Sequence, residues 1–155
     1  KDTYLTIAKN IYKEKDIFYI GRSLDYYLNM EGALKLKEIS YIHSEAYAAG
    51  ELKHGTISLI EKNTPVFASA TNSKLNAKTI SNLKEVLARG ANIYLITDDN
   101  YKDDTFNIIN IPKASEFLKP ILVIIPYQLI AYYTALLKGT DIDKPKNLAK
   151  SVTVE

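Results

Sequence analysis

Residues 31–55 hold a cluster of side chains that could carry out acid–base chemistry. At about 100° per residue on a helix, Glu31, Lys35 and Glu38 fall on one narrow stripe. The segment continues with five more ionisable side chains, including both histidines of the chain: His43, Glu45, Glu51, Lys53 and His54. A general acid–base site needs such a cluster of titratable groups.

The same stripe has a simpler interpretation as a solvated helix face. Glutamates and lysines three and four residues apart commonly pair on exposed helices, where each pair contributes roughly a few tenths of a kcal/mol. A solvated face is normally several columns wide, whereas this stripe is a single column between Leu28 and Ile39 on one side and Leu34 on the other. Apolar neighbours of this kind can shift the pKa of a carboxyl group. The pattern leaves both interpretations open.

The composition indicates one domain without a nucleic-acid surface. A chain of 155 residues with 46% hydrophobic residues can bury a sizeable core. Its 20 basic and 18 acidic residues are mixed along the chain, so we expect no nucleic acid and no anionic membrane as partners, whereas small anionic substrates remain possible. The absence of cysteine excludes disulfides, thiolate nucleophiles and cysteine-ligated metals. No secretory leader is visible, so we expect a cytoplasmic protein.

Short apolar runs alternate with helical patterns along the chain. The expected strands are residues 17–20, 65–70, 92–97 and 106–111. The expected helices are residues 3–15, 25–41, 75–87 (capped by Asn72 or Ser73 and stopped by Gly90) and 120–137, with a short helical turn at 50–54 that Gly55 ends. This alternation predicts an α/β fold: a doubly wound, mainly parallel sheet flanked by helices, as in a flavodoxin-like three-layer sandwich.

The longest apolar run, residues 120–137, needs to be distinguished from a membrane span. It contains Pro126, Gln128 and Thr134, and it barely reaches the roughly 20 residues that a bilayer span requires. We therefore predict a buried helix that could be kinked at Pro126, and no membrane association. Gly139 ends this helix, which divides the chain into a domain of residues 1–139 and an extended tail of residues 140–155.

The turn formed by Gly21, Arg22 and Ser23 follows the first expected strand and precedes a helix. Backbone N–H groups in such a turn can hold a phosphate. A strand-to-helix turn needs a glycine in any case, so the turn can equally be structural. A flavodoxin-like nucleotide binder would need a glycine-rich or Ser/Thr-rich loop here, and only Gly21 is present.

Two long motifs, EGALKLKEISYIHSEAYAAGELKHG and KGTDIDKPKNLAKSVTVE, carry a resemblance to a known family. The chain resembles the second sugar isomerase (SIS) module of the glucosamine-6-phosphate synthase family, also called glucosamine-fructose-6-phosphate aminotransferases, over essentially its whole length. The terminal motif is absent from most SIS relatives that do not make glucosamine. The sequence departs from the family at Thr56, where proline usually follows HG, and at Ser23, in a turn that is more often GRG.

The resemblance implies an enzyme that makes glucosamine 6-phosphate from fructose 6-phosphate and glutamine-derived ammonia. It also implies roles for individual residues. Lys150 would form a Schiff base with the sugar, and Glu38 would carry a proton between C1 and C2. His54 would open the sugar ring, and Lys35 would be a supporting charge beside Glu38. The other substrate-binding candidates are Ala149, Glu45 and Glu51. His43 has no role in the family motif and is expected in the core or at an interface.

The resemblance further implies which partners are needed and which are not. The phosphate-gripping first SIS module and the glutaminase domain would belong to a longer parent chain, and the site would be shared between two modules and two subunits of a homodimer, with His54 reaching the neighbour's site. This chain alone should be inactive. No cofactor or metal is expected, because the lysine forms the imine itself and the two histidines are not a recognisable ligand set. The alternative is a non-catalytic SIS module that binds or senses sugar phosphates, which would not need Lys150.

Overall fold

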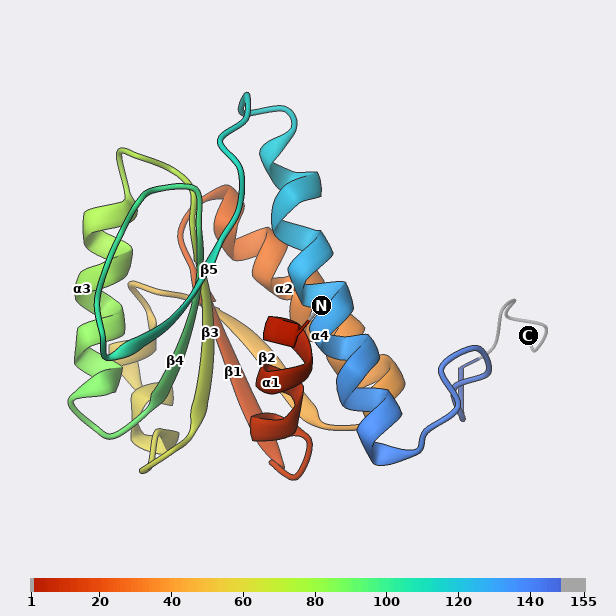
Figure 1. The fold of residues 1–155 in the computed structure, drawn as a ribbon. Helices are drawn as coiled ribbons and strands as arrows, with labels where there is room; N and C mark the ends of the chain where they lie inside the picture. Colours follow the sequence, from red (N-terminus) through yellow and green to blue (C-terminus); the bar gives the residue numbers. More distant parts are fainter. Residues whose placement is uncertain (1, 149–155) are drawn as a thin grey trace, which may run out of the picture.

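The computed structural model describes residues 2–148, and its centre is a five-stranded sheet in which all strands are parallel (Figure 1). The strands are β1 (Asp16–Gly21), β2 (His43–Ala48), β3 (Pro65–Ala70), β4 (Asn92–Thr97) and β5 (Phe106–Asn110). Their order across the sheet is β2-β1-β3-β4-β5. This is the strand order of flavodoxin-like folds, so the predicted fold class is confirmed.

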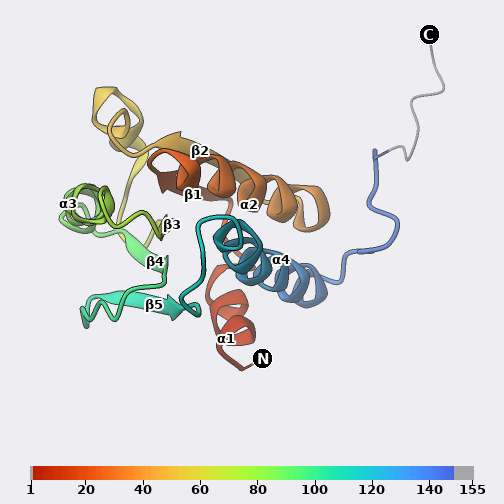
Figure 2. The same ribbon diagram turned by 90° about the horizontal axis from the view of Figure 1, so that it is seen from above.

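Helices cover both faces of this sheet. They are α1 (Asp2–Ile11), α2 (Leu24–Ser40), α3 (Asn76–Leu87) and α4 (Lys119–Lys138), with two short 3₁₀ turns, η1 (Leu52–His54) and η2 (Thr56–Leu59). Seen from above, α1, α2 and α4 lie on one face of the sheet, and α3 lies on the other with the 3₁₀ turns (Figure 2). The three-layer arrangement follows from the parallel strands, whose crossover connections must pass over the faces.

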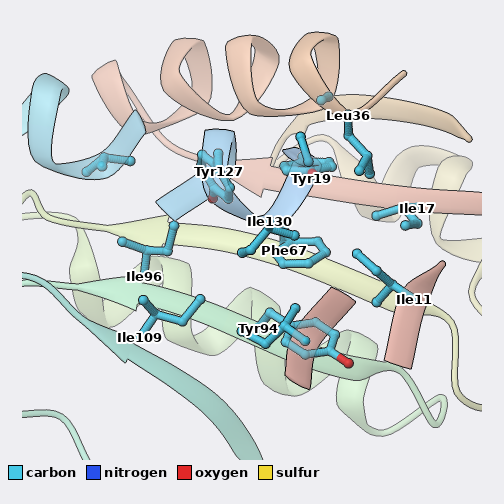
Figure 3. Packing of buried hydrophobic residues seen from close by; sticks show 14 of the residues in the cluster. Ile11, Ile17, Tyr19, Leu36, Phe67, Tyr94, Ile96, Ile109, Tyr127 and Ile130 are labelled. Atoms are coloured by element: carbon cyan, nitrogen blue, oxygen red, sulfur yellow. The ribbon is translucent and has the colours of Figure 1, made fainter. Parts of the chain in front are cut away.

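Both faces of the sheet are packed with apolar side chains. Beneath α1, α2 and α4, the rings of Tyr19, Phe67 and Tyr94 stack across three strands, with centroid separations of 5.1 and 4.7 Å (Figure 3). Tyr127 of α4 meets the Tyr19 ring edge-on at 5.3 Å. The opposite face has its own cluster, which includes Val66, Leu83 and Leu95. Burial on two faces explains why β3 and β4 are continuous apolar runs in the sequence.

The sequence prediction was wrong in omitting β2. This strand lies at the edge of the sheet and pairs only with β1. Of its six residues only Ser44 is buried, so it alternates polar and small side chains instead of forming an apolar run. A half-exposed edge strand gives a weaker sequence signal than a central one.

Helix ends differ in part from the prediction. The first helix stops at Ile11, and neither Asn72 nor Ser73 caps α3, which starts at Asn76. The side chain of Asn72 instead accepts the Lys74 N–H at 3.1 Å in a local turn. Gly139 ends α4 in the left-handed conformation with φ of 68°, as expected for a terminating glycine.

Helix α4 is long and apolar enough, by length and composition alone, to cross a membrane. In the structure it packs on α1 and α2 and buries Val123, Tyr127 and Ile130. The predicted burial of this helix is therefore confirmed for the face that packs on α1 and α2. Its other side remains exposed, at Ile121, Ile125, Tyr132 and Leu136.

Candidate active site

Helix α2 places Glu31, Lys35 and Glu38 in one chain of ion pairs. The Lys35 Nζ lies 2.8 Å from Glu38 Oε2 and 3.5 Å from Glu31 Oε1. The side chain of Glu38 is 27% exposed and that of Lys35 is 32% exposed, so both are partly covered. The hydrogen bond to Glu38 raises the pKa of Lys35 above its ordinary value. A lasting positive charge therefore lies beside the Glu38 carboxylate at neutral pH.

These two side chains lie at the edge of an apolar cavity of about 390 Å³ between α2 and α4. Its walls come from both helices and the tail: Ile39, Ile125, Leu129, Ala131, Tyr132 and Ile142. Gln128 supplies the remaining polar group. The volume is in the range of small-molecule sites, about 300–1,000 Å³. Lys35 and Glu38 thus line this hollow, whereas Glu31, the third member of the stripe, is 43% exposed and does not line it.

The tail reaches this region before the described residues end. The Thr140 hydroxyl donates to the Ile39 carbonyl oxygen at 2.6 Å, and Ile39 directly follows Glu38 in the sequence. Ile142 then contributes to the cavity wall. Ala149 and Lys150 lie outside the described residues 2–148, so their roles as substrate contact and Schiff-base lysine stay predictions.

The predicted residue for ring opening, His54, lies away from Glu38 within one chain. Glu38 precedes the start of β2, whereas Glu51 and His54 follow its end, and a six-residue strand is about 20 Å long. Glu51 and His54 are both exposed at η1. Among residues 2–148, no hydrogen bond or ion pair joins His54 to Glu38. A shared site would therefore need His54 from another subunit, as the resemblance predicts.

Glu45 belongs to a second polar cluster, along β2. The His43 ring lies 2.8 Å from Asp16 Oδ1 and 3.5 Å from Glu45 Oε1, and the Tyr47 hydroxyl donates to Glu45. That hydrogen bond is the main cause that lowers the pKa of Glu45. His43 is 63% exposed, so its expected place in the core was wrong, and a place at an interface stays a prediction.

Sequence reasoning missed a buried polar network at the carboxyl ends of β1 and β3. The Asp25 carboxylate accepts the Thr71 N–H at 3.0 Å and the Thr71 hydroxyl at 2.7 Å. The Lys119 Nζ donates to the Thr71 carbonyl oxygen at 2.7 Å and pairs with Asp98 at 3.0 Å. Burial raises the pKa of Asp25. These residues come from segments far apart in the chain, so no local pattern indicates that they meet.

This network bears on the turn at Gly21, Arg22 and Ser23. In flavodoxin-like folds the crevice between β1 and β3 is the usual ligand site. Here Asp25 places a carboxyl group in the first turn of α2. The Arg22 guanidinium donates a hydrogen bond to the Asn82 Oδ1 at 2.8 Å. A carboxyl group at this helix end disfavours an added phosphate, which supports the structural interpretation of the turn.

Comparison with known families matches residues 10–138 to the SIS domain. The chain is 52% identical over its full length to the glutamine–fructose-6-phosphate aminotransferase (isomerizing) of Clostridium acetobutylicum. It is 50% identical over its full length to the enzyme of the same name from Brucella abortus. The chain spans about a quarter of the length of these relatives, 26% in each case.

Solved structures with the same architecture include two proteins of glucosamine 6-phosphate metabolism by name. The C-terminal domain of glucosamine-fructose-6-phosphate aminotransferase from Francisella tularensis has a TM-score of 0.87 and 40% identity, covering 92% of this chain and 41% of that one. Glucosamine-6-phosphate deaminase from Thermotoga maritima has a TM-score of 0.75 and 27% identity, covering 97% of this chain and 45% of that one. In both cases this chain corresponds to less than half of the solved chain.

Proposed function

The chain belongs to the SIS domain family, and from this premise we propose that it is the carboxy-terminal half of the isomerase domain of a glutamine–fructose-6-phosphate aminotransferase. The observation that carries the proposal is the Lys35–Glu38 pair, 2.8 Å apart, at the edge of an apolar cavity. The similarity over the whole chain to enzymes of that name supports it. The substrates are then fructose 6-phosphate and ammonia, and the product is glucosamine 6-phosphate.

The first chemical step joins the open-chain sugar to Lys150. The lysine amine attacks the C2 carbonyl carbon, and a water molecule leaves as the C=N bond forms. At an ordinary pKa of about 10.4, only about one lysine in a few thousand is neutral at pH 7. The site must therefore lower the pKa of Lys150 by excluding water or by placing another cation nearby.

Ammonia then displaces the lysine at C2, and the rest of the reaction is a proton transfer by Glu38. The carboxylate removes a proton from C1 and returns it to C2, while the C1 hydroxyl loses its proton and the imine nitrogen gains one, so the C2 imine and C1 alcohol become a C2 amine and a C1 aldehyde. One carboxylate can reach both adjacent carbons, and such a base typically contributes about 10²–10⁴-fold to the rate. Lys35 keeps a positive charge beside Glu38 while the Glu38 carboxylate gains and then loses a proton. His54 of a second subunit opens the sugar ring.

An exposed apolar surface fits the partner that this proposal needs. Along the open side of α4, Ile121, Ile125, Tyr132 and Leu136 are 42–56% exposed. Such a surface beside the cavity suits the first SIS module, which would supply the phosphate grip and close the site. The glutaminase domain would supply ammonia, and the complete protein would be a homodimer. It would be cytoplasmic, because a phosphorylated sugar does not cross membranes unaided.

Borohydride trapping in the intact aminotransferase tests the proposal. The protein is mixed with fructose 6-phosphate without ammonia and reduced, and the labelled peptide is identified by mass. Labelling should occur at Lys150 and disappear in Lys150→Ala, while Lys144→Ala, in the same tail, keeps it. Glu38→Gln should be labelled normally, because Glu38 acts after the imine. Equal labelling of Lys150→Ala and wild type would overturn the imine assignment, and no labelling of wild type would favour a non-catalytic sugar-phosphate module.

A further inference from the structure

Helix α2 ends at Tyr41, a residue in an unusual backbone conformation. Tyr41 has φ of 58° and ψ of 21°, and its N–H donates to the Lys37 carbonyl oxygen at 3.1 Å. This left-handed conformation at a helix end is normally taken by glycine or asparagine, because a larger side chain strains the backbone there. The backbone alone therefore does not explain a tyrosine, and its side chain is the part to examine.

The Tyr41 side chain holds the tail. Its hydroxyl oxygen accepts the Lys146 backbone N–H at 2.8 Å, across 105 positions of sequence. The Lys146 Nζ also lies 4.5 Å from the centroid of the Tyr41 ring, in cation–π geometry. One side chain thus binds both the backbone and the charge of the same tail residue.

The tail between this anchor and α4 is itself ordered by hydrogen bonds. Thr140 donates to the Ile39 carbonyl oxygen at 2.6 Å, and the Asp141 side chain accepts the N–H groups of residues 143 and 144 at 3.0 and 2.9 Å. The tail is therefore attached at two points, Ile39 and Tyr41, which both lie within three residues of Glu38.

We propose that Tyr41 is a positioning residue that fixes the tail against the end of α2 and so limits where Lys150 can lie relative to Glu38. The inference rests on the proposed function, which gives Lys150 its imine. Lys150 follows the anchor at Lys146 by only four positions of sequence, whereas it follows Thr140 by ten. A shorter tether raises the effective concentration of the amine at the sugar.

Tyr41→Phe in the intact aminotransferase tests this role, because it keeps the ring and removes the hydrogen-bond acceptor. The rate at which borohydride-trappable sugar forms should fall by about two- to tenfold, as expected for the loss of one hydrogen bond. The Kd of fructose 6-phosphate should not change, since the other module grips the phosphate. Tyr12→Phe is the matched control: the Tyr12 hydroxyl has no hydrogen bond among residues 2–148, so its trapping rate should equal that of wild type.

A second variant removes the other partner of the same hydrogen bond. Lys146→Pro eliminates the N–H without changing Tyr41, and it should also slow trapping without changing the Kd. If the two residues act through one contact, the double variant Tyr41→Phe/Lys146→Pro should be no slower than the slower single variant. A purely structural defect would instead lower the Tm of the protein and weaken sugar binding as well.

The outcomes separate this inference from the proposed function. If borohydride traps the sugar on wild-type protein and on Tyr41→Phe at the same rate, the positioning role is overturned and the proposed function is left intact. Fully additive slowing in the double variant would also overturn it. Wild-type protein that is never trapped would contradict the proposed function itself.

Discussion

Glu38 has two kinds of neighbour that together suit it to proton transfer. On one side the Lys35 ammonium lies 2.8 Å from its carboxylate, and on the other Ile39, Ile125 and Tyr132 line the adjoining hollow, so the Glu38 side chain is only 27% exposed. Electrostatic interactions are stronger where water is partly excluded. The sequence placed these groups side by side because Lys35, Glu38 and Ile39 lie within five consecutive residues of one helix, although the pattern alone left the solvated-face interpretation open.

The Glu45–Tyr47 pair allows a test at a single residue. Because the hydrogen bond from Tyr47 lowers the pKa of Glu45, Tyr47→Phe should raise that pKa toward its ordinary value near 4.5. The carboxyl carbon resonance of Glu45, followed by NMR during a pH titration, measures this directly. Tyr12→Phe should leave the titration unchanged, and an unchanged Glu45 pKa in Tyr47→Phe would contradict the assigned hydrogen bond.

The same pair predicts the direction of a pH effect on stability. A carboxyl group whose pKa is lower in the folded state stabilises the fold above its unfolded pKa, and that contribution is lost as pH falls through the folded pKa. The difference in free energy of unfolding between wild type and Tyr47→Phe should therefore be present at neutral pH, begin to shrink as pH falls toward the ordinary carboxyl value of 4.5, and vanish once pH is below the lowered pKa of Glu45. The Glu45 carboxylate is about half exposed and Tyr47 is only partly buried, so the difference should be small.

At the scale of elements, α2 and α4 cross where a glycine meets a tyrosine. A Cβ added at Gly32 would lie 2.7 Å from the Tyr127 ring, closer than side-chain carbons approach in proteins. In most helices a glycine-to-alanine change is stabilising by about 1 kcal/mol. Here Gly32→Ala should instead destabilise the protein by about 1–3 kcal/mol, because the Tyr127 ring is buried against Tyr19 and would have to shift within the core.

Urea denaturation of the 155-residue chain measures this change in the free energy of unfolding. The Tyr127→Ala background provides the control, because it removes the ring that an alanine at 32 would meet. In that background Gly32→Ala should be neutral or stabilising. If Gly32→Ala stabilises the protein that retains Tyr127, the close packing of the two helices is contradicted.

The elements differ in how well the sequence predicts them. The runs of β3 and β4 are buried on both faces, so their continuous apolar character identified them. The edge strand β2 has polar side chains on its open side and was missed. The Asp25–Thr71–Lys119 network was also missed, since its members are brought together only when the strands and α4 pack. Spacing along one helix predicts which side chains are neighbours, whereas contacts between distant segments leave no local pattern.

At the scale of the whole molecule, the candidate site is open and incomplete in one chain. His54 lies beyond the far end of β2 from Glu38, and the apolar side of α4 next to the cavity is exposed. The purified 155-residue chain should therefore form no glucosamine 6-phosphate from fructose 6-phosphate and ammonia. Product formation, measured by chromatography against the intact aminotransferase as positive control, would contradict the need for a second module and a second subunit.

The central claim is that Glu38 moves the proton between C1 and C2, and a deuterium label tests it most directly. Intact aminotransferase is given fructose 6-phosphate carrying deuterium at C1 together with glutamine, and the loss or transfer of the label is followed by NMR. In Glu38→Gln the rate should fall by about 10²–10⁴-fold while borohydride trapping at Lys150 stays at the wild-type level. Deuterium leaving C1 at the wild-type rate in Glu38→Gln would show that another group is the base.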